Sequence, residues 1–164
     1  MKYLFTATIF AAALIACNSN DDKATETKEA GHDAHASTAT AIEMPAMPEV
    51  PANARVYFAN LKDGQTVTSP LKVEMRVDAM QVDTANGILK PASGHHHILV
   101  DMDSIKTGEV IKKDSVHIHF GNAQTSVEIK LPPGKHSLTL QFADALHRSY
   151  GSKLTSKITV DVKQ

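Results

Sequence analysis

Histidines at alternating positions are the residues in this chain whose type and spacing point most directly to chemistry. The chain has nine histidines, and four of them form two His-x-His pairs, His95 with His97 and His117 with His119. Each pair lies in a short run with the period of two that a β-strand produces. Alternate side chains of a strand point to one face, so both members of a pair share a face. We expect these faces to point away from the core, because the opposite faces are largely apolar.

Imidazole side chains on neighbouring strands can converge on one metal ion. Cross-strand neighbours have Cβ atoms about 4.5–5.5 Å apart, and imidazole nitrogens bind zinc at about 2.0–2.1 Å. His95, His97, His117 and His119 are therefore the predicted ligands of a metal site, with copper or zinc as the ion, since imidazole suits both. The alternative is that they are ordinary half-buried polar residues, hydrogen-bonded to their neighbours.

Four further residues are candidates for alternative ligands, or for hydrogen-bond partners that orient the ligands. Asp101 continues the face that carries the first histidine pair. Asp144 is placed to orient His147, which falls in the loop between the last two strands, although a purely structural turn explains that segment equally well. His136 is in phase with the apolar residues of the strand that follows it, so we expect it to end the core.

The elements that must position these histidines are short strands. Alternation of apolar and polar residues predicts seven of them. They lie near residues 56–58, 71–77, 95–101, 116–120, 127–131, 138–142 and 158–162. Turn signals such as Asp63-Gly64 separate them, and no segment has convincing helical periodicity. The predicted fold is all-β, an antiparallel seven-strand β-sandwich of immunoglobulin-like or cupredoxin-like type.

The first 50 residues are expected to stand apart from this sandwich. Residues 1–16 combine a positive charge at Lys2 with a short apolar run, which is typical of a secretory signal peptide and too short for a comfortable membrane span. Residues 17–50 are rich in small and acidic residues and end in prolines, so they are predicted to be a disordered acidic linker. The β-sandwich domain is then expected over residues 51–164.

Cys17, the only cysteine, directly follows the apolar run. The segment Leu14-Ile15-Ala16-Cys17 resembles the bacterial lipobox, in which the thiol is acylated and the cysteine becomes the new N-terminus. The resemblance implies a lipoprotein signal peptide, palmitate or a similar acyl chain on Cys17, and attachment to a membrane through the N-terminal lipid. Asn18 resembles the residue found in lipoproteins that are sent on to the outer membrane, where the domain would face the periplasm or the cell surface.

Composition argues against several classes of function. With Cys17 lipidated, no thiol remains for a disulfide, a catalytic nucleophile or a thiolate metal site. Residues 18–50 hold seven acidic residues against two lysines, whereas residues 51–164 are mildly basic without a basic run, so nucleic acid is not an expected partner. No nucleophile elbow, phosphate loop or His-Glu-x-x-His motif is present, and the protein is not expected to be an enzyme.

Four histidine-containing segments together carry a resemblance to a known family. They are Gly94-His95-His96-His97, His117-Ile118-His119-Phe120-Gly121, Pro133-Gly134-Lys135-His136 and the stretch from Asp144 to His147. They look like domain of unknown function 4399, a family of bacterial envelope domains, over about residues 54–162. The resemblance implies an extracytoplasmic domain in which these histidines form a shared pattern, and it implies no activity.

The hypothesis from the sequence is a lipid-anchored envelope β-sandwich that binds a copper or zinc ion through a histidine cluster. The alternative is a structural or protein-interaction module of the cell envelope that binds no metal.

The lipobox-like segment predicts the effect of removing its thiol. Cys17→Ala is expected to abolish acylation, so that the chain is left unprocessed or is released from the outer membrane fraction. Detergent partitioning and the mass of the mature protein measure this, with Asn20→Ala as a control that keeps the cysteine. If Cys17→Ala partitions like the parent, the lipoprotein assignment is wrong.

Overall fold

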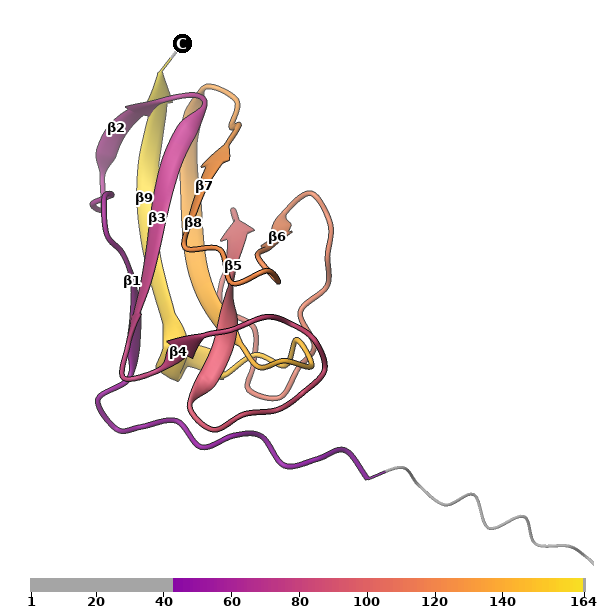
Figure 1. Ribbon diagram of the computed structural model, residues 1–164. Helices are drawn as coiled ribbons and strands as arrows, with labels where there is room; N and C mark the ends of the chain where they lie inside the picture. Colours follow the sequence, from indigo (N-terminus) through magenta and orange to yellow (C-terminus); the bar gives the residue numbers. More distant parts are fainter. Residues whose placement is uncertain (1–42, 164) are drawn as a thin grey trace, which may run out of the picture. The chain divides into compact units, whose positions relative to one another are not determined.

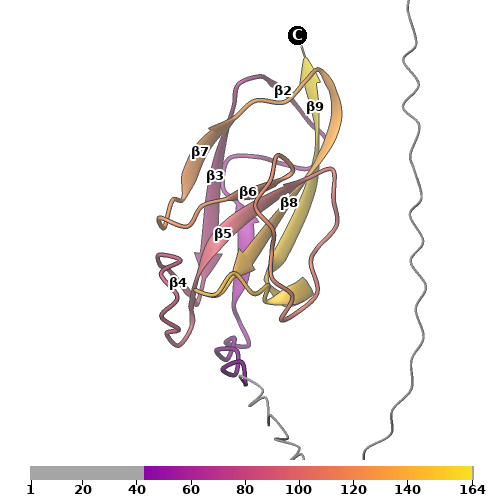
Figure 2. The ribbon, with the colours of Figure 1, turned by 90° about the vertical axis from the view of Figure 1, so that its right-hand side faces the viewer.

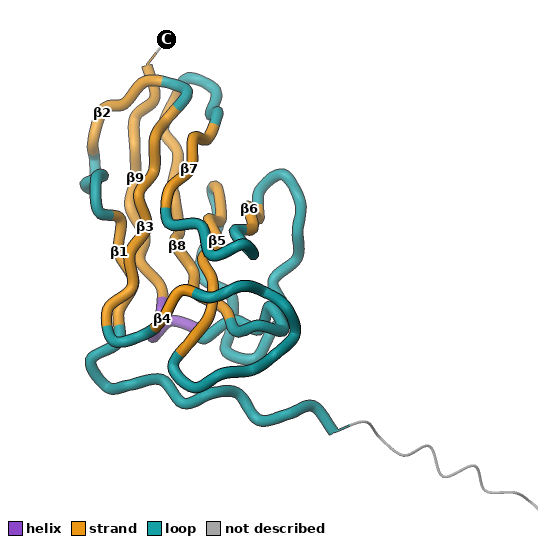
Figure 3. Tube along the Cα trace, in the orientation of Figure 1, coloured by secondary structure: helices purple, strands orange, loops and turns teal. Residues whose placement is uncertain are grey.

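The computed structural model describes residues 43–163, which form nine β-strands and one short 3₁₀-helix (Figures 1 and 3). The elements are β1 (Arg55–Phe58), β2 (Gln65–Thr68), β3 (Leu71–Asp78), β4 (Gln81–Val82), β5 (Ser93–Val100), β6 (His117–His119), β7 (Ser126–Ile129), β8 (Gly134–Ala143), η1 (Gly151–Leu154) and β9 (Thr155–Lys163). The expected signal peptide, Cys17 and most of the expected linker lie outside the described residues. Within residues 43–163, no helix is long and apolar enough to cross a membrane.

Two sheets face each other across a common core (Figure 2). The smaller sheet has the order β1-β3-β7, and the larger has the order β2-β9-β8-β5-β4, with β6 also paired to β5. Alternate residues of both sheets meet in the core, among them Val73 and Met75 of β3 and Leu138 and Leu140 of β8, all of which are fully buried. Burial of each such side chain is worth about 1.5–3 kcal/mol, so aliphatic packing holds together a domain that is poor in aromatic residues.

The described residues form an all-β domain, as the alternation predicts, but the strand count and the pairing differ from the prediction. Segments β1, β3, β5, β6, β7, β8 and β9 fall where the sequence pattern places them, whereas β2 and β4 were not predicted. Both of these strands pair in parallel, β2 with β9 and β4 with β5, so the larger sheet is mixed and not purely antiparallel. Alternation reports which residues of a strand are buried and not the direction of its partner, and a two-residue strand such as β4 is too short to show a period.

Strand β5 differs from the other strands because all eight of its residues are buried. One face, with Ile98 and Val100, packs in the core between the sheets. On the other face, Ile111 of the long connection from β5 to β6 packs against Leu99. The prediction that His95 and His97 lie on the face away from the core between the sheets is confirmed, but this face is not exposed, because both residues are fully buried. Sequence periodicity does not report such cover.

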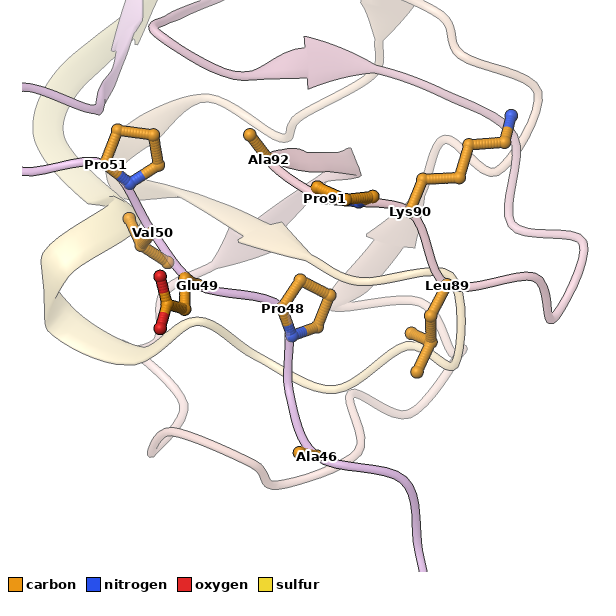
Figure 4. Close-up of a pocket in the computed structure, with 9 residues that line it drawn as sticks. All are labelled: Ala46, Pro48, Glu49, Val50, Pro51, Leu89, Lys90, Pro91 and Ala92. Carbon is orange, nitrogen blue, oxygen red and sulfur yellow. The ribbon is translucent and has the colours of Figure 1, made fainter.

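The last part of the expected linker belongs to the compact domain, which begins at Glu43. Met47 and Val50 pack against the main core, and Lys153 donates a hydrogen bond to the carbonyl of Val50. This segment lies beside the one that leads into β5, and the two line an apolar groove of about 600 Å³ (Figure 4). The groove is lined by Ala46, Pro48, Glu49, Val50, Pro51, Leu89, Lys90, Pro91 and Ala92, so no histidine lines it.

Gly94, which directly precedes the histidines of β5, has no room for a side chain. A Cβ atom there would lie 2.2 Å from the carbonyl oxygen of Ala143 and 2.8 Å from the ring of Phe142. Because the nearest obstacle is backbone of the paired strand β8, Gly94→Ala is expected to lower the free energy of unfolding by about 1–3 kcal/mol. Chemical denaturation measures this, with the exposed Lys72→Ala on β3 as a control. An unchanged midpoint would contradict the described β5–β8 packing.

Candidate metal centre

Three histidines of the β5–β6 pair gather on one face of the larger sheet. The antiparallel register places His97 directly opposite His119, and His95 lies two residues before His97 on the same face. The Nε2 atoms of His95 and His97 are 2.9 Å apart, and one ring nitrogen from each of the three residues lies within 4.8 Å of the others. Among the described residues, this is a group of side chains with the spacing to hold a metal ion.

A fourth histidine reaches the same place from a loop. His147 lies between β8 and η1, and its Nε2 is 3.2 Å from Nε2 of His119. Its ring centroid is 4.8 Å from that of His119, 5.0 Å from that of His95 and 6.3 Å from that of His97. His147 was predicted as an alternative ligand or an orienting partner, and the structure brings it to the edge of the triad.

His117, one of the four predicted ligands, lies outside this group. Its register partner on β5 is Leu99, two residues beyond His97, and its Nδ1 is 2.7 Å from a carboxylate oxygen of Asp114. The same oxygen accepts a hydrogen bond from the backbone N–H of His117, so Asp114 holds both the backbone and the ring of His117 at the start of β6. Alternation correctly put His117 and His119 on one face, but the register, which the sequence does not state, decides which of them meets His97.

The other predicted residues have local partners. Asp101 and His136 bond each other, with 2.8 Å between carboxylate Oδ2 and ring Nδ1, at the end of β5 away from the triad. Asp144 is fully buried and forms an ion pair with Arg148. His96, which was not a predicted site residue, lies on the core face of β5 and packs against Phe142 with ring centroids 5.0 Å apart. None of these side chains is part of the triad.

Burial determines the protonation state of the triad. His95 and His97 are completely inaccessible to solvent, while His119 and His147 are partly exposed. Burial, reinforced by the neighbouring imidazoles, lowers the pKa of His97 to about 2 and that of His95 to about 3. Burial also lowers the pKa of His119. These rings are therefore neutral at pH 7 and offer lone pairs.

One residue that shapes the site was missed by the sequence analysis. Gly121 closely follows His119, and a Cβ atom there would lie 2.3 Å from Cε1 and 2.5 Å from Nε2 of the His119 ring. Any side chain at this position would push the imidazole away from the triad. The sequence alone holds no signal for it, because only the register seen in the structure, continued beyond β6, puts position 121 opposite His95, where a side chain would crowd the ligands.

Comparison with known families gives one match. The model of the domain of unknown function DUF4399 matches residues 73–163, which is more than half of the chain. The chain belongs to this family. The matched range includes His95, His97, His119 and His147, so the whole cluster lies within the DUF4399 domain. Neither the curated proteins nor the solved structures gave a match.

The buried histidines predict a loss of stability in mild acid. His95, His96 and His97 have pKa values of about 3, 4 and 2 in the folded protein, against about 6.5 when unfolded. Between these values the unfolded chain binds more protons, so stability is full above about pH 6.5 and falls as the pH is lowered. As the pH falls through this range, each of the three rings lowers the free energy of unfolding by up to about 1.4 kcal/mol per pH unit.

Denaturant midpoints of the metal-free protein between about pH 7.5 and pH 5 measure this effect. Carboxylates such as Asp101 and Asp114 have lowered pKa values, through hydrogen bonds from their histidine partners, and so titrate below this window. His96→Phe removes one buried imidazole on the core side and is expected to flatten the pH dependence. A midpoint that does not change across the window would contradict the buried, neutral state of these rings.

Proposed function

We propose that this DUF4399 protein is a lipid-anchored protein of the bacterial envelope that binds one Cu(II) or Zn(II) ion through His95, His97 and His119. The observation that carries the proposal is the convergence of three imidazoles on one point of a rigid sheet. The role we propose is sequestration, delivery or sensing of the ion and not catalysis. The anchor rests on the lipobox-like segment that ends at Cys17.

The spacing of the ring nitrogens supports the proposal. An ion with four nitrogen ligands at about 2.0–2.1 Å in a tetrahedron separates them by about 3.3 Å. The 2.9 Å between Nε2 of His95 and Nε2 of His97 is close to this value. Both residues sit on β5, which is paired with β8 on one side and with β6, the strand of His119, on the other.

The chemistry of the donors supports a borderline transition metal. The described triad offers neutral nitrogen and neither thiolate nor carboxylate, which suits copper and zinc better than calcium or magnesium. Because burial keeps these rings neutral, an ion at pH 7 does not have to displace protons from them.

Stability alone gives no reason for this arrangement. Nδ1 of His95 and Nδ1 of His97 are buried without a hydrogen-bond partner. An unsatisfied buried polar group costs about 1–3 kcal/mol, so apolar side chains would give a more stable sheet here. Local conflicts of this kind are expected at functional sites, and this favours the metal proposal over a purely structural role for these two residues.

Titration with metal tests the proposal. Cu(II) or Zn(II) is expected to raise the melting temperature of the full protein, purified in detergent, as the metal concentration exceeds the dissociation constant. His119→Ala removes a partly exposed ligand and should abolish most of the shift. Gly121→Ala keeps every histidine but displaces the His119 ring, and it should weaken binding in the same direction with a smaller effect on the metal-free protein.

His136→Ala is the matched control, because it removes an imidazole that bonds Asp101 away from the triad. It is expected to leave the metal-induced shift unchanged. If the parent does not respond to either metal, or if His119→Ala responds like the parent, the metal proposal fails and the interaction-module hypothesis takes its place.

A further inference from the structure

His147 gives the triad a fourth nitrogen. We infer that His147 is the fourth ligand, so that the bound ion is enclosed by four imidazoles and keeps no open coordination position. This inference rests on the proposed function and deepens it, because it separates a holding site from a catalytic one. Structural metal sites have a complete set of protein ligands, whereas catalytic ones keep a position for water or substrate.

The position of the ring supports this role. Nε2 of His147 points at Nε2 of His119, 3.2 Å away, and this separation is close to the spacing of about 3.3 Å expected for two nitrogens on one tetrahedral ion. The ring also lies edge-on to that of His95, with a centroid distance of 5.0 Å. His147 therefore adjoins the triad on the side of His119 and His95, next to the three nitrogens of His95, His97 and His119 that lie within 4.8 Å of one another.

The loop that carries His147 is fixed at both ends. The backbone N–H of His147 donates to the carbonyl of Asp144, and its carbonyl accepts the N–H of Ile111. The buried Asp144 carboxylate accepts the backbone N–H groups of Leu146 and Arg148 and pairs with the Arg148 guanidinium. The ring is consequently delivered to the triad by a preorganised turn, as a ligand position requires.

The backbone of His147 carries strain that its side chain explains. Its φ is +64°, in the left-handed region that glycine adopts without cost. The other non-glycine residues with positive φ in the described chain are three alanines and an aspartate, which have short side chains. A bulky residue held in this conformation points to a function for that residue.

Exposure gives the four ligands different roles. His95 and His97 are inaccessible, whereas His119 and His147 are partly exposed, so an ion must enter and leave past the latter two. The buried pair holds the ion, and the exposed pair is where a competing ligand would first displace nitrogen. Such a division suits a protein that accepts an ion and passes it on.

Electron paramagnetic resonance of the Cu(II)-loaded full protein tests the inference, with azide as a probe for an open position. The parent spectrum should indicate four nitrogen ligands and should not change when azide is added. His147→Gly relieves the backbone and removes the ring, so it should bind Cu(II) through three nitrogens, respond to azide, and regain the parent spectrum when free imidazole is supplied. His147→Asn is a second variant, because asparagine also tolerates positive φ but does not add the backbone flexibility of glycine. It should likewise bind Cu(II) through three nitrogens and respond to azide.

The outcomes separate the two proposals. If the parent binds Cu(II) but already responds to azide, or if His147→Gly leaves the parent spectrum unchanged, the fourth-ligand inference is overturned and the triad stands. If the parent binds no Cu(II) or Zn(II), the proposed function fails and this inference falls with it. His136→Ala, as control, should retain the parent spectrum in every respect.

Discussion

The pairing of β5 with both β6 and β8 is the constraint on which the site depends. It fixes His97 opposite His119 and leaves His95 on the same face, two residues nearer the start of β5. A shift of one residue in either pairing would turn these side chains into the core between the sheets. The buried backbone around Gly94 and the apolar residues on the opposite face of β5 hold that register.

Burial of His95 and His97 determines the chemistry of the face of the larger sheet that carries the triad. His119 and His147 lie against His95 and His97, which are inaccessible to solvent, and desolvation keeps the rings of His95 and His97 neutral. In an exposed sheet the same residues would be half protonated near pH 6.5 and would compete less well for a metal ion. The same burial makes the metal-free protein sensitive to acid, so site chemistry and stability share one cause.

Alternation in the sequence was enough to predict the all-β class, seven of the strands and the shared faces of the histidine pairs. It was not enough for β2 and β4, whose parallel pairings depend on distant partners. Three of the four predicted ligands lie together, and the exception, His117, is separated by register and by its bond to Asp114. The approach of His147 depends on a loop conformation with positive φ, and a single sequence contains no periodic signal for that.

Two neutral imidazoles whose Nδ1 atoms lack a hydrogen-bond partner, a glycine that makes room for the His119 ring, and a loop histidine with positive φ lie close together. Crystallography of the protein soaked with copper or zinc, with anomalous data collected at the absorption edge of the metal, tests this account most directly. The account predicts one strong anomalous peak between the Nε2 atoms of His95, His97 and His119, within bonding distance of His147. An anomalous map without a peak there, or with its main peak at other residues, would contradict it.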